Sequence, residues 1–396
     1  VHGDLGEREL KRLAETLRRE IDAKKGPGDG DRKEEGPTVS ELIGQKYERV
    51  LRTVLAASKE DIADFFFSSV AASYGPHTDY LSMAEQERFM TKMSNSLVGI
   101  GATLREEDDG SVRVEAIVIG GPADRSGVLQ LNDRIVGVDQ DNAGAAGMTD
   151  IRYMRIDKVV GMIKGKDRTT VRLKLQPADG EPGEFKEVSI VRGKVEHKSQ
   201  QVTAELIVPK DPVLGGAPRL GYVRVPSFYL DFRDGVPSVA NDVSALLTRL
   251  NKERIDGLVV DLQGNGGGAL EEVIKIAGFF LGARPVVQVR DAKGAIETRS
   301  STLRRPLYDG PLVVLTDKAS ASASEILAAA LQDYNRAVVV GESSTFGKGT
   351  VQQPMEIGRF FRFFEDNSRA GFLKATIQKF YRVSGSSTQE DGVVPD

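Results

Sequence analysis

The chain has 396 residues, a formal net charge of −4 and no cysteine. Its hydrophobic (40%) and charged (28%) fractions are close to those of soluble globular proteins, which argues against disorder or membrane residence for the chain as a whole. The missing cysteines exclude thiol catalysis, disulfides and thiolate metal sites, and the interspersed charges argue against nucleic acid as the main partner.

Histidine chemistry and membrane insertion are also disfavoured. His2, His77 and His197 lie far apart and none has the spacing of a metal ligand pair, so the sequence predicts no metal site, no cofactor and no histidine-based triad. No apolar run is long enough to span a bilayer, and we expect no integral membrane segment. The chain begins without a start methionine or a signal peptide, which suggests a mature form or a fragment.

The first 96 residues are predicted to form a helical region. Apolar residues recur there at spacings of three and four, which is the pattern of amphipathic helices. The expected helices span residues 5–24, 40–55, 59–73 and 84–95. Residues 24–37 are dense in glycine, proline and charge and predict an exposed or mobile linker. Because amphipathic stripes mostly serve packing, we expect this region to support the rest of the chain.

The pattern changes at residue 97. From there to residue 177 the chain shows short β-rich runs separated by Gly, Asp and Pro turns, with one helical stretch at 156–163. Residues 120–139 combine a short helix, Gly127 as its expected C-cap and a strand that begins after an Asn-Asp turn. These features predict a compact module of strands and short helices.

Three segments of this module resemble a PDZ domain of the bacterial, protease-associated type: LVGIGATL at 97–104, GGPADRSGVLQLNDRIVGVD at 120–139 and IDKVVGMIKG at 156–165. A PDZ domain binds an extended peptide as an added strand, and backbone amides take up the terminal carboxylate. The resemblance implies that the peptide-binding residues are Leu97, Val98, Gly99, Ile100 and Gly101. The amides from Val98 to Gly101 would hold the carboxylate, and Leu97, Ile100 and the helix would line the side-chain pocket. The alternative is another β-rich domain with glycine turns.

After a polar connecting segment at 178–219, strand-like and helical segments alternate from residue 220 to residue 396. Such alternation predicts a mostly parallel sheet with helices packed on it, and ligands of such folds gather beyond the carboxyl ends of the strands. The expected strands lie at 221–228, 255–262, 285–290, 311–317 and 336–342, and the expected helices at 239–250, 269–281 and 324–333. The whole chain is therefore predicted to be a multidomain α/β protein with a helical region (1–96), a PDZ-like module (97–177), a connecting segment (178–219) and an α/β core (220–396).

A glycine-rich loop, DLQGNGGGAL at 261–270, follows one of these strands and precedes a helix. Successive glycines let a ligand approach the backbone amides closely. The loop matches neither phosphate-binding glycine motif, so an oxyanion hole, which needs preorganised amides, is the better functional interpretation. A purely structural turn is the alternative.

Three serines at alternate positions, Ser320, Ser322 and Ser324, lie between a strand and a helix. The positive end of the helix would favour a serine alkoxide, although serines also serve as linker and cap residues. Lys348 lies between two glycines beyond the next strand, and a lysine acts as a base if burial or a neighbouring charge lowers its pKa. Gln352 could orient its amine. A solvated surface lysine is the alternative.

Together, SASASEI, the helix ending in QDY, VVVGE, TFGKGTVQQ and DLxxNGGGAL resemble the carboxy-terminal-processing peptidases, or tail-specific proteases, a serine-lysine family with an inserted PDZ domain. Residues 376–396 resemble the branch that includes the periplasmic tail-specific protease of Gram-negative bacteria. The resemblance covers residues 97–396 and implies a periplasmic location.

The resemblance also implies a role for each matching residue. Ser322 would be the nucleophile, Lys348 the general base and Gln352 the support of the lysine. The oxyanion hole would consist of the Ala323 amide and the amide of Gly266 or Gly267. The remaining matches, Ser320, Ser324 and Asp333, would be structural.

Two departures from the family pattern concern the site. Gln263 stands where the family usually has an arginine, and Ser343-Ser344 lengthens the loop before Lys348, which leaves the resting position of the lysine open. The implied function is a serine endopeptidase that captures proteins by apolar C-terminal tails, with an adaptor protein as a further candidate partner. The alternatives are a catalytically silent tail-binding scaffold and a serine hydrolase that acts on esters or lactams.

Overall fold

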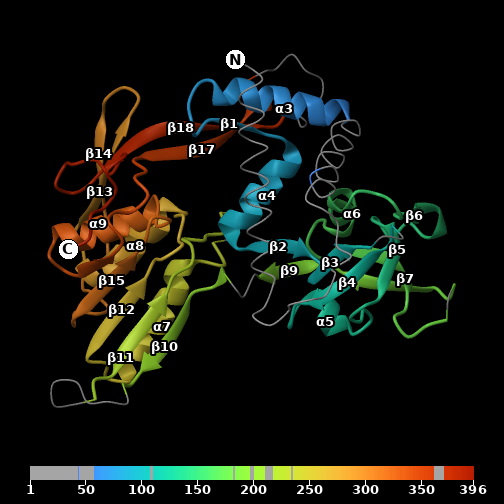
Figure 1. Ribbon diagram of the computed structural model, residues 1–396, viewed down its shortest axis with the longest axis horizontal. Helices are drawn as coiled ribbons and strands as arrows, with labels where there is room; N and C mark the ends of the chain where they lie inside the picture. The colour runs from blue at the N-terminus through green and yellow to red at the C-terminus, as the bar shows by residue number, and fades with distance from the viewer. Residues whose placement is uncertain are drawn as a thin grey trace, which may run out of the picture. The chain divides into compact units, whose positions relative to one another are not determined.

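The computed structural model describes residues 43, 58–107, 110–181, 183–196, 200–209, 217–232, 235–360 and 370–396 (Figure 1). The first two predicted helices, apart from Ile43, and the linker between them lie outside these ranges. The chain forms two compact units, Val1–Tyr80 and Leu81–Asp396. The domain boundaries expected from the sequence stay predictions.

The two remaining N-terminal helices were predicted close to their observed ends. Helix α3, Lys59–Ala72, begins with a capping box in which the Asp61 amide donates to Ser58 Oγ (3.1 Å) and the Ser58 amide to Asp61 Oδ2 (2.9 Å). Strand β1, Asp79–Leu81, follows. Helix α4, Met83–Ser94, ends where Asn95 takes the left-handed conformation of a C-cap.

The described residues between 96 and 196 form a module of strands and short helices. The sequence predicts such a module at 97–177, and its last two strands lie in the stretch that was predicted to be a connecting segment. Strands β3 to β8 build an antiparallel sheet in the order β3-β4-β5-β7-β8, with β6 beside β5, while β2 pairs with β9. Gly127 caps α5 in the left-handed conformation, as predicted. The elements are β2 (Ser96–Gly99), β3 (Ala102–Glu106), β4 (Val112–Ile117), α5 (Pro122–Ser126), β5 (Arg134–Asp139), the 3-10 turn Ala145–Gly147, β6 (Thr149–Asp150), α6 (Ile156–Ile163), β7 (Thr170–Gln176), β8 (Lys186–Val191) and β9 (Gly193–Glu196).

The C-terminal part contains the predicted, mostly parallel sheet, in the order β10-β11-β12-β15-β16. Only the edge pair β10-β11 is antiparallel. Helices α7, α8 and α9 lie side by side next to this sheet and share one apolar core with it (Figure 1). The elements are β10 (Thr203–Ile207), β11 (Leu220–Arg224), α7 (Val239–Lys252), β12 (Gly257–Asp261), α8 (Leu270–Leu281), β15 (Leu312–Thr316), α9 (Ala323–Asp333) and β16 (Val338–Gly341).

A second, antiparallel sheet corrects one part of the prediction. We expected residues 285–290 in the parallel sheet, but β13 (Pro285–Asp291) pairs antiparallel with β14 (Ile296–Ser300) and β18 (Phe372–Tyr381). Strand β17 (Thr350–Glu356) pairs with β18 and is followed by the 3-10 turn Ile357–Arg359. The reason lies in the connection: a tight turn joins β13 to β14, whereas parallel strands need a crossover of a dozen or more residues. Because of this sheet and the PDZ-like module, most strand pairings are antiparallel, although the α/β class is correct.

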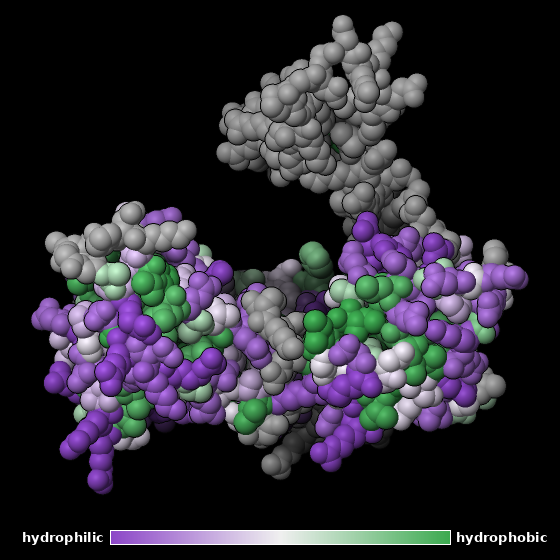
Figure 2. Space-filling view, turned by 90° about the horizontal axis from the view of Figure 1, so that it is seen from below, coloured by the Kyte–Doolittle hydropathy of each residue, from purple (hydrophilic) through white to green (hydrophobic). Residues whose placement is uncertain are grey.

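On the face shown in Figure 2, hydrophilic residues predominate and hydrophobic residues gather in separate patches. None of the helices in the described ranges combines the length and the hydropathy that a bilayer crossing requires. Nor do the described residues bring three or more His, Asp or Glu side chains together in a way that would hold a metal ion.

Candidate active site

The serine turn connects β15 to α9 at the carboxyl edge of the parallel sheet. Ser322 is the residue directly before α9, and its backbone has φ 58° and ψ −112°. A residue other than glycine rarely adopts a positive φ, and such strain concentrates at functional sites. A sharp turn between a strand and a helix also presents a serine at the edge of the sheet, beside the positive end of the helix.

The two flanking serines are tied into the fold. Ser320 and Ser324 are both 0% exposed. Ser320 Oγ donates to the Leu262 carbonyl (2.9 Å), and Ser324 Oγ donates to the Asn265 carbonyl (2.8 Å). These hydroxyls therefore bind the serine turn to the glycine-rich loop, while half-buried Ser322 remains the serine that a substrate can reach.

Asn265 organises the glycine-rich loop, and sequence reasoning did not single it out. Its side chain is 0% exposed; Nδ2 donates to the Val225 carbonyl (2.8 Å), and Oδ1 accepts from the Gly267 amide (2.8 Å). Its carbonyl also accepts from the Ala321 amide (3.0 Å). One buried amide residue thus links β11, the glycines and the serine turn.

Gly267 lies directly against the serine turn. A Cβ atom on it would lie 2.8 Å from Ser322 Cβ and 3.2 Å from the Ala323 nitrogen, closer than side chains tolerate. Its φ of 104° is a second reason why glycine is needed here. Gly266, by contrast, faces open space, since a Cβ there would meet no atom within 4 Å beyond its chain neighbours. The structure therefore brings Gly267 of the glycine-rich loop directly against Ser322 and Ala323 of the serine turn.

Asp317 is a second link between the two loops. It accepts hydrogen bonds from the Gly264 amide (2.9 Å), the Ala319 amide (3.0 Å) and the Ser320 amide (2.9 Å). Burial alone would raise the pKa of this carboxyl, but the hydrogen bonds outweigh burial and lower its pKa below the ordinary value. The Asp317 carboxylate is therefore charged at neutral pH and holds the glycine-rich loop to the serine turn.

Glu325 joins the serine turn to the lysine loop. This residue of α9 is 0% exposed, and its carboxylate accepts four hydrogen bonds: from the Ser322 amide (2.8 Å), the Thr345 hydroxyl (2.6 Å), the Gly347 amide (2.7 Å) and the Lys348 amide (3.0 Å). Donors around a buried carboxylate compensate for its lost hydration. The backbones of Ser322 and Lys348 are thus bonded to the same side chain.

Lys348 is half-buried, and its pKa is lowered from the ordinary lysine value. The main cause is the loss of hydration, followed by repulsion from Lys374, whereas the charge of Glu325 acts in the opposite direction. A lysine in this environment releases its proton more readily than an exposed lysine. This is the property that the sequence interpretation required of a base.

The C-terminal segment fixes the lysine loop from the other side. The Thr388 hydroxyl donates to the Lys348 carbonyl (2.9 Å), and the Gly349 amide donates to Gln389 Oε1 (2.9 Å). Gly347 has φ 93°, and a Cβ on it would lie 2.7 Å from the Glu390 carbonyl oxygen. Only glycine fits there, which explains one of the two glycines around the lysine.

Ser343 and Ser344 precede the part of the loop that holds Lys348. Ser344 Oγ accepts from Lys318 Nζ (2.8 Å), whereas Thr345 to Lys348 are held by Glu325. The Phe346 amide also donates to the Ser320 carbonyl (3.1 Å). Ser343 and Ser344 therefore lie upstream of the hydrogen bonds that position Lys348.

Gln352 and Asp333 have different surroundings. Gln352 lies on β17, and its Nε2 donates to the hydroxyls of Thr350 (2.8 Å) and Thr376 (3.3 Å).

Asp333 forms an ion pair with Arg382 (2.6 Å), and both side chains are mostly buried. Asp333 thus fastens the end of α9 to the chain after β18, which is a structural role.

The peptide-binding residues predicted in the PDZ-like module lie in two settings. Leu97, Val98 and Gly99 belong to β2 and pair with β9. Ile100 is buried, and Gly101, at φ 77°, leads into β3. Because β3 lies at the end of the strand order in its sheet, the chain from Ile100 onward presents the edge to which a strand can be added.

The Glu325 carboxylate gives a direct test of this geometry. We expect Glu325→Ala to lower the free energy of unfolding by about 3 kcal/mol or more, because it leaves buried donors without an acceptor. Urea denaturation followed by circular dichroism measures the loss. The control Glu205→Ala removes an exposed carboxylate from β10 of the same core and should change stability by less than about 0.5 kcal/mol. Equal unfolding midpoints for Glu325→Ala and the wild type would contradict the described contacts.

Comparison with known proteins gives two family matches. Residues 219–396 match peptidase family S41, and residues 90–176 match the PDZ domain. Over 356 residues the chain is 38% identical to the tail-specific protease of Haemophilus influenzae, which covers 89% of this chain and 48% of that protein. The chain thus spans about half the length of this relative.

Two solved structures are also similar. The photosystem II D1 C-terminal processing protease is 26% identical, with 89% of this chain and 86% of that chain covered and a TM-score of 0.46. The PDZ domain of a carboxy-terminal protease from Vibrio cholerae, in complex with peptide, is 38% identical, with 26% of this chain and 98% of that chain covered and a TM-score of 0.23. By the family matches, residues 219–396 are a peptidase family S41 domain and residues 90–176 are a PDZ domain.

Proposed function

We propose that the chain is a serine endopeptidase that uses Ser322 as nucleophile and Lys348 as general base. The observation that carries this proposal is the Glu325 carboxylate, which accepts from the amides of both residues and thereby fixes the serine turn against the lysine loop. The lowered pKa of Lys348 supports the same role, because only a neutral amine can accept the serine proton.

The proposed reaction follows the logic of a serine-lysine pair. The neutral Lys348 amine takes the proton of Ser322 Oγ as this oxygen attacks the substrate carbonyl carbon. The protonated amine then gives the proton to the leaving amine, and the peptide bond breaks. In the second step, water attacks the acyl-enzyme while Lys348 takes its proton. Lys348 then returns the proton to Ser322 Oγ as the ester bond breaks, which frees the serine.

The negative charge on the tetrahedral intermediate needs donors that are already in place. We assign this role to the amides of Ala323 and Gly266. Ala323 is the first residue of α9, so its amide is not used by the helix. Gly266 is preferred over Gly267, because the Gly267 amide already donates to Asn265.

Gln352 would support the lysine through its carbonyl oxygen. Its Nε2 is occupied by Thr350 and Thr376, and an amide side chain has one further polar atom, Oε1, which accepts hydrogen bonds. In this proposal Oε1 accepts from the Lys348 amine and orients it.

The PDZ domain would supply the substrate. We propose that a C-terminal tail adds as a strand along β3, with its carboxylate on the amides of the turn around Ile100 and Gly101. Partly buried side chains of α6, among them Ile156 and Met162, would accept apolar residues of the tail. The match of residues 90–176 to the PDZ domain supports peptide binding by this module. A location in the cell envelope, as the resemblance of residues 376–396 implies, also belongs to the proposal.

Cleavage and binding of the same peptide test this function together. We expect Ser322→Ala and Lys348→Ala to lower the cleavage of a peptide with an apolar tail by roughly 10⁴-fold or more, while both variants still bind it. The control Ser324→Ala should retain cleavage at reduced stability, since it loses only a buried hydrogen bond. A peptide that ends in an amide should bind more weakly than the free acid.

The possible outcomes separate the candidate functions. Cleavage that persists in Ser322→Ala would contradict the assignment of Ser322 as the nucleophile. Binding without turnover by the wild type would favour a tail-binding scaffold, and turnover of esters alone would favour an ester hydrolase.

The pH dependence of cleavage tests the base. Since the amine must be neutral, kcat/KM should rise with pH through the Lys348 pKa, and the lowered pKa places this rise below the ordinary lysine value of about 10.4. Lys374→Gln removes a positive charge that lowers this pKa, so the rise should move to higher pH. The control Lys293→Gln, an exposed lysine on the β13-β14 turn, should leave the profile unchanged. A Lys374→Gln profile that stays in place or moves to lower pH would contradict Lys348 as the titrating base.

A further inference from the structure

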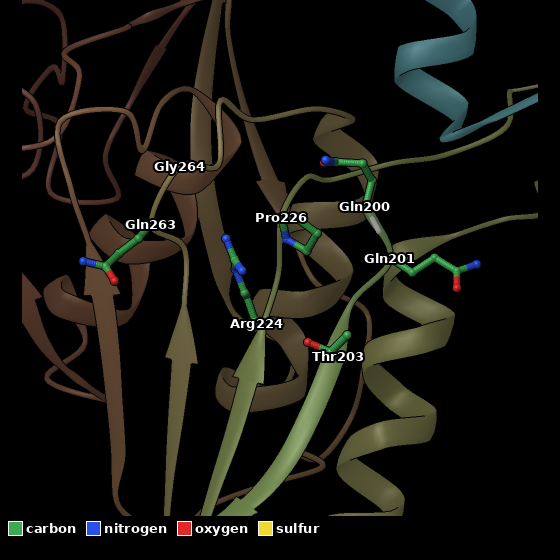
Figure 3. Close-up of a pocket in the computed structure, with 7 residues that line it drawn as sticks. All are labelled: Gln200, Gln201, Thr203, Arg224, Pro226, Gln263 and Gly264. Atoms are coloured by element: carbon green, nitrogen blue, oxygen red, sulfur yellow. The ribbon is translucent and has the colours of Figure 1, made fainter. Parts of the chain in front are cut away.

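A small cavity lies beside the glycine-rich loop, at the carboxyl edge of the parallel sheet (Figure 3). Its volume is about 220 Å³, below the range of about 300 to 1,000 Å³ that holds a whole drug-sized ligand. It is therefore suited to one side chain or one terminal group. The lining residues come from three strand ends and the segment before β10: Gln200, Gln201, Thr203, Arg224, Pro226, Gln263 and Gly264.

Arg224 is the only charged residue among those that line the cavity. Figure 3 shows its side chain extending past the end of β11 toward Gly264 and Pro226, while the side chains of Gln201 and Gln263 point away on opposite sides. Arg224 is exposed, and among the described residues its guanidinium has no hydrogen bond or ion pair. The cavity thus offers a cation with free donors, with Thr203 and Gln200 as uncharged polar neighbours.

The carboxylate opposite Arg224 on the neighbouring strand β12 is already engaged. Asp261 lies opposite Arg224 in the β11-β12 register, but its Oδ2 accepts from the Tyr222 hydroxyl (2.5 Å) and its Oδ1 from the Gln263 amide (2.9 Å). The hydrogen bond to Asp261 is the main reason why the pKa of Tyr222 is raised to about 12, so this phenol stays a donor at neutral pH. Asp261 is therefore engaged with Tyr222 and the Gln263 amide. The Arg224 guanidinium remains available to bind a ligand.

The cavity and the serine turn share one loop. Gly264 lines the cavity, and three residues later Gly267 touches Ser322. Val225, which follows Arg224, accepts the hydrogen bond from Asn265 on the same loop. A peptide whose carbonyl lies at Ser322 extends by about 3.3 Å per residue, so a residue a few positions from the scissile bond comes within reach of Arg224.

We propose that this cavity is a substrate subsite for a carboxylate, held by the Arg224 guanidinium with help from Thr203 and Gln200. A guanidinium presents paired donors that match the two oxygens of a carboxylate. The proposal rests on the proposed function, because it places a peptide at Ser322. The carboxylate can come from an acidic side chain near the scissile bond or from the free end of a short product or substrate.

Matched peptides test the subsite. The probe is a fluorogenic peptide with one cleavage site and an amidated C-terminus, in which a Glu or a Gln is placed in turn at each of three positions on either side of the scissile bond. We expect the wild type and Arg224→Lys to favour Glu over Gln about five- to tenfold in kcat/KM at one position. This ratio should fall with added salt and should be about one in Arg224→Gln. The control Arg305→Gln, an exposed arginine outside the cavity, should keep the ratio of the wild type.

A second peptide pair identifies the source of the carboxylate. The two peptides end near the cleavage site and differ only in a free or an amidated C-terminus. A preference for the free acid that disappears in Arg224→Gln assigns the cavity to a terminal carboxylate, whereas a preference that persists belongs to the PDZ domain. Ratios near one in the wild type for all peptides, or unchanged ratios in Arg224→Gln, would overturn the subsite.

The inference can fail separately from the proposed function. If the wild type cleaves none of these peptides, the peptidase proposal fails, and the dissociation constants of the Glu and Gln peptides on Ser322→Ala still test the cavity. A carboxylate preference in binding that Arg224→Gln removes would support the subsite, and its absence would overturn it.

Discussion

The candidate site depends on one buried carboxylate. Glu325 is completely enclosed and accepts hydrogen bonds from the serine turn on one side and from the lysine loop on the other. A buried charge is tolerated only when its oxygens are fully bonded, so neither loop can move away without a large energetic cost. Residues that lie more than twenty positions apart in the chain are thereby held in one arrangement. The same constraint fixes the lysine loop between Thr345 and Lys348, downstream of Ser343 and Ser344.

A second polar cluster holds the other half of the site. Asn265, Asp317 and the hydroxyls of Ser320 and Ser324 fasten the glycine-rich loop to the serine turn, so that Gly267 touches Ser322. Buried polar groups of this kind specify one geometry, because each lost bond leaves an unpaired atom in an apolar surrounding. The strained backbone of Ser322 is kept in place by this network from one side and by Glu325 from the other. In physical terms, the structure is preorganised where negative charge would develop.

Much of the fold and part of the candidate site could be predicted from the sequence. Periodicity and turn residues predicted a module of strands and short helices, the helices of the core and the placement of the serine turn before α9, whereas the PDZ assignment came from the resemblance of three segments. It failed at β13, because an alternating pattern says nothing about which sheet a strand joins; only the short turn to β14 reveals the hairpin. Glu325 was read as part of a helix, although the spacing of Ser322 and Glu325 is that of a capping box and could have indicated it. Asn265, Asp317 and Arg224 were missed since their partners lie far along the chain and no local pattern encodes such contacts.

The central claim is that Ser322 is the nucleophile and that Lys348 activates it. The most direct measurement is covalent labelling with a fluorophosphonate, which reacts with activated serines, followed by peptide mass spectrometry. The account predicts a single adduct on Ser322, formed faster as the pH rises and nearly absent in Lys348→Ala. No adduct, an adduct on another serine, or equally fast labelling of Ser322 in Lys348→Ala would contradict it.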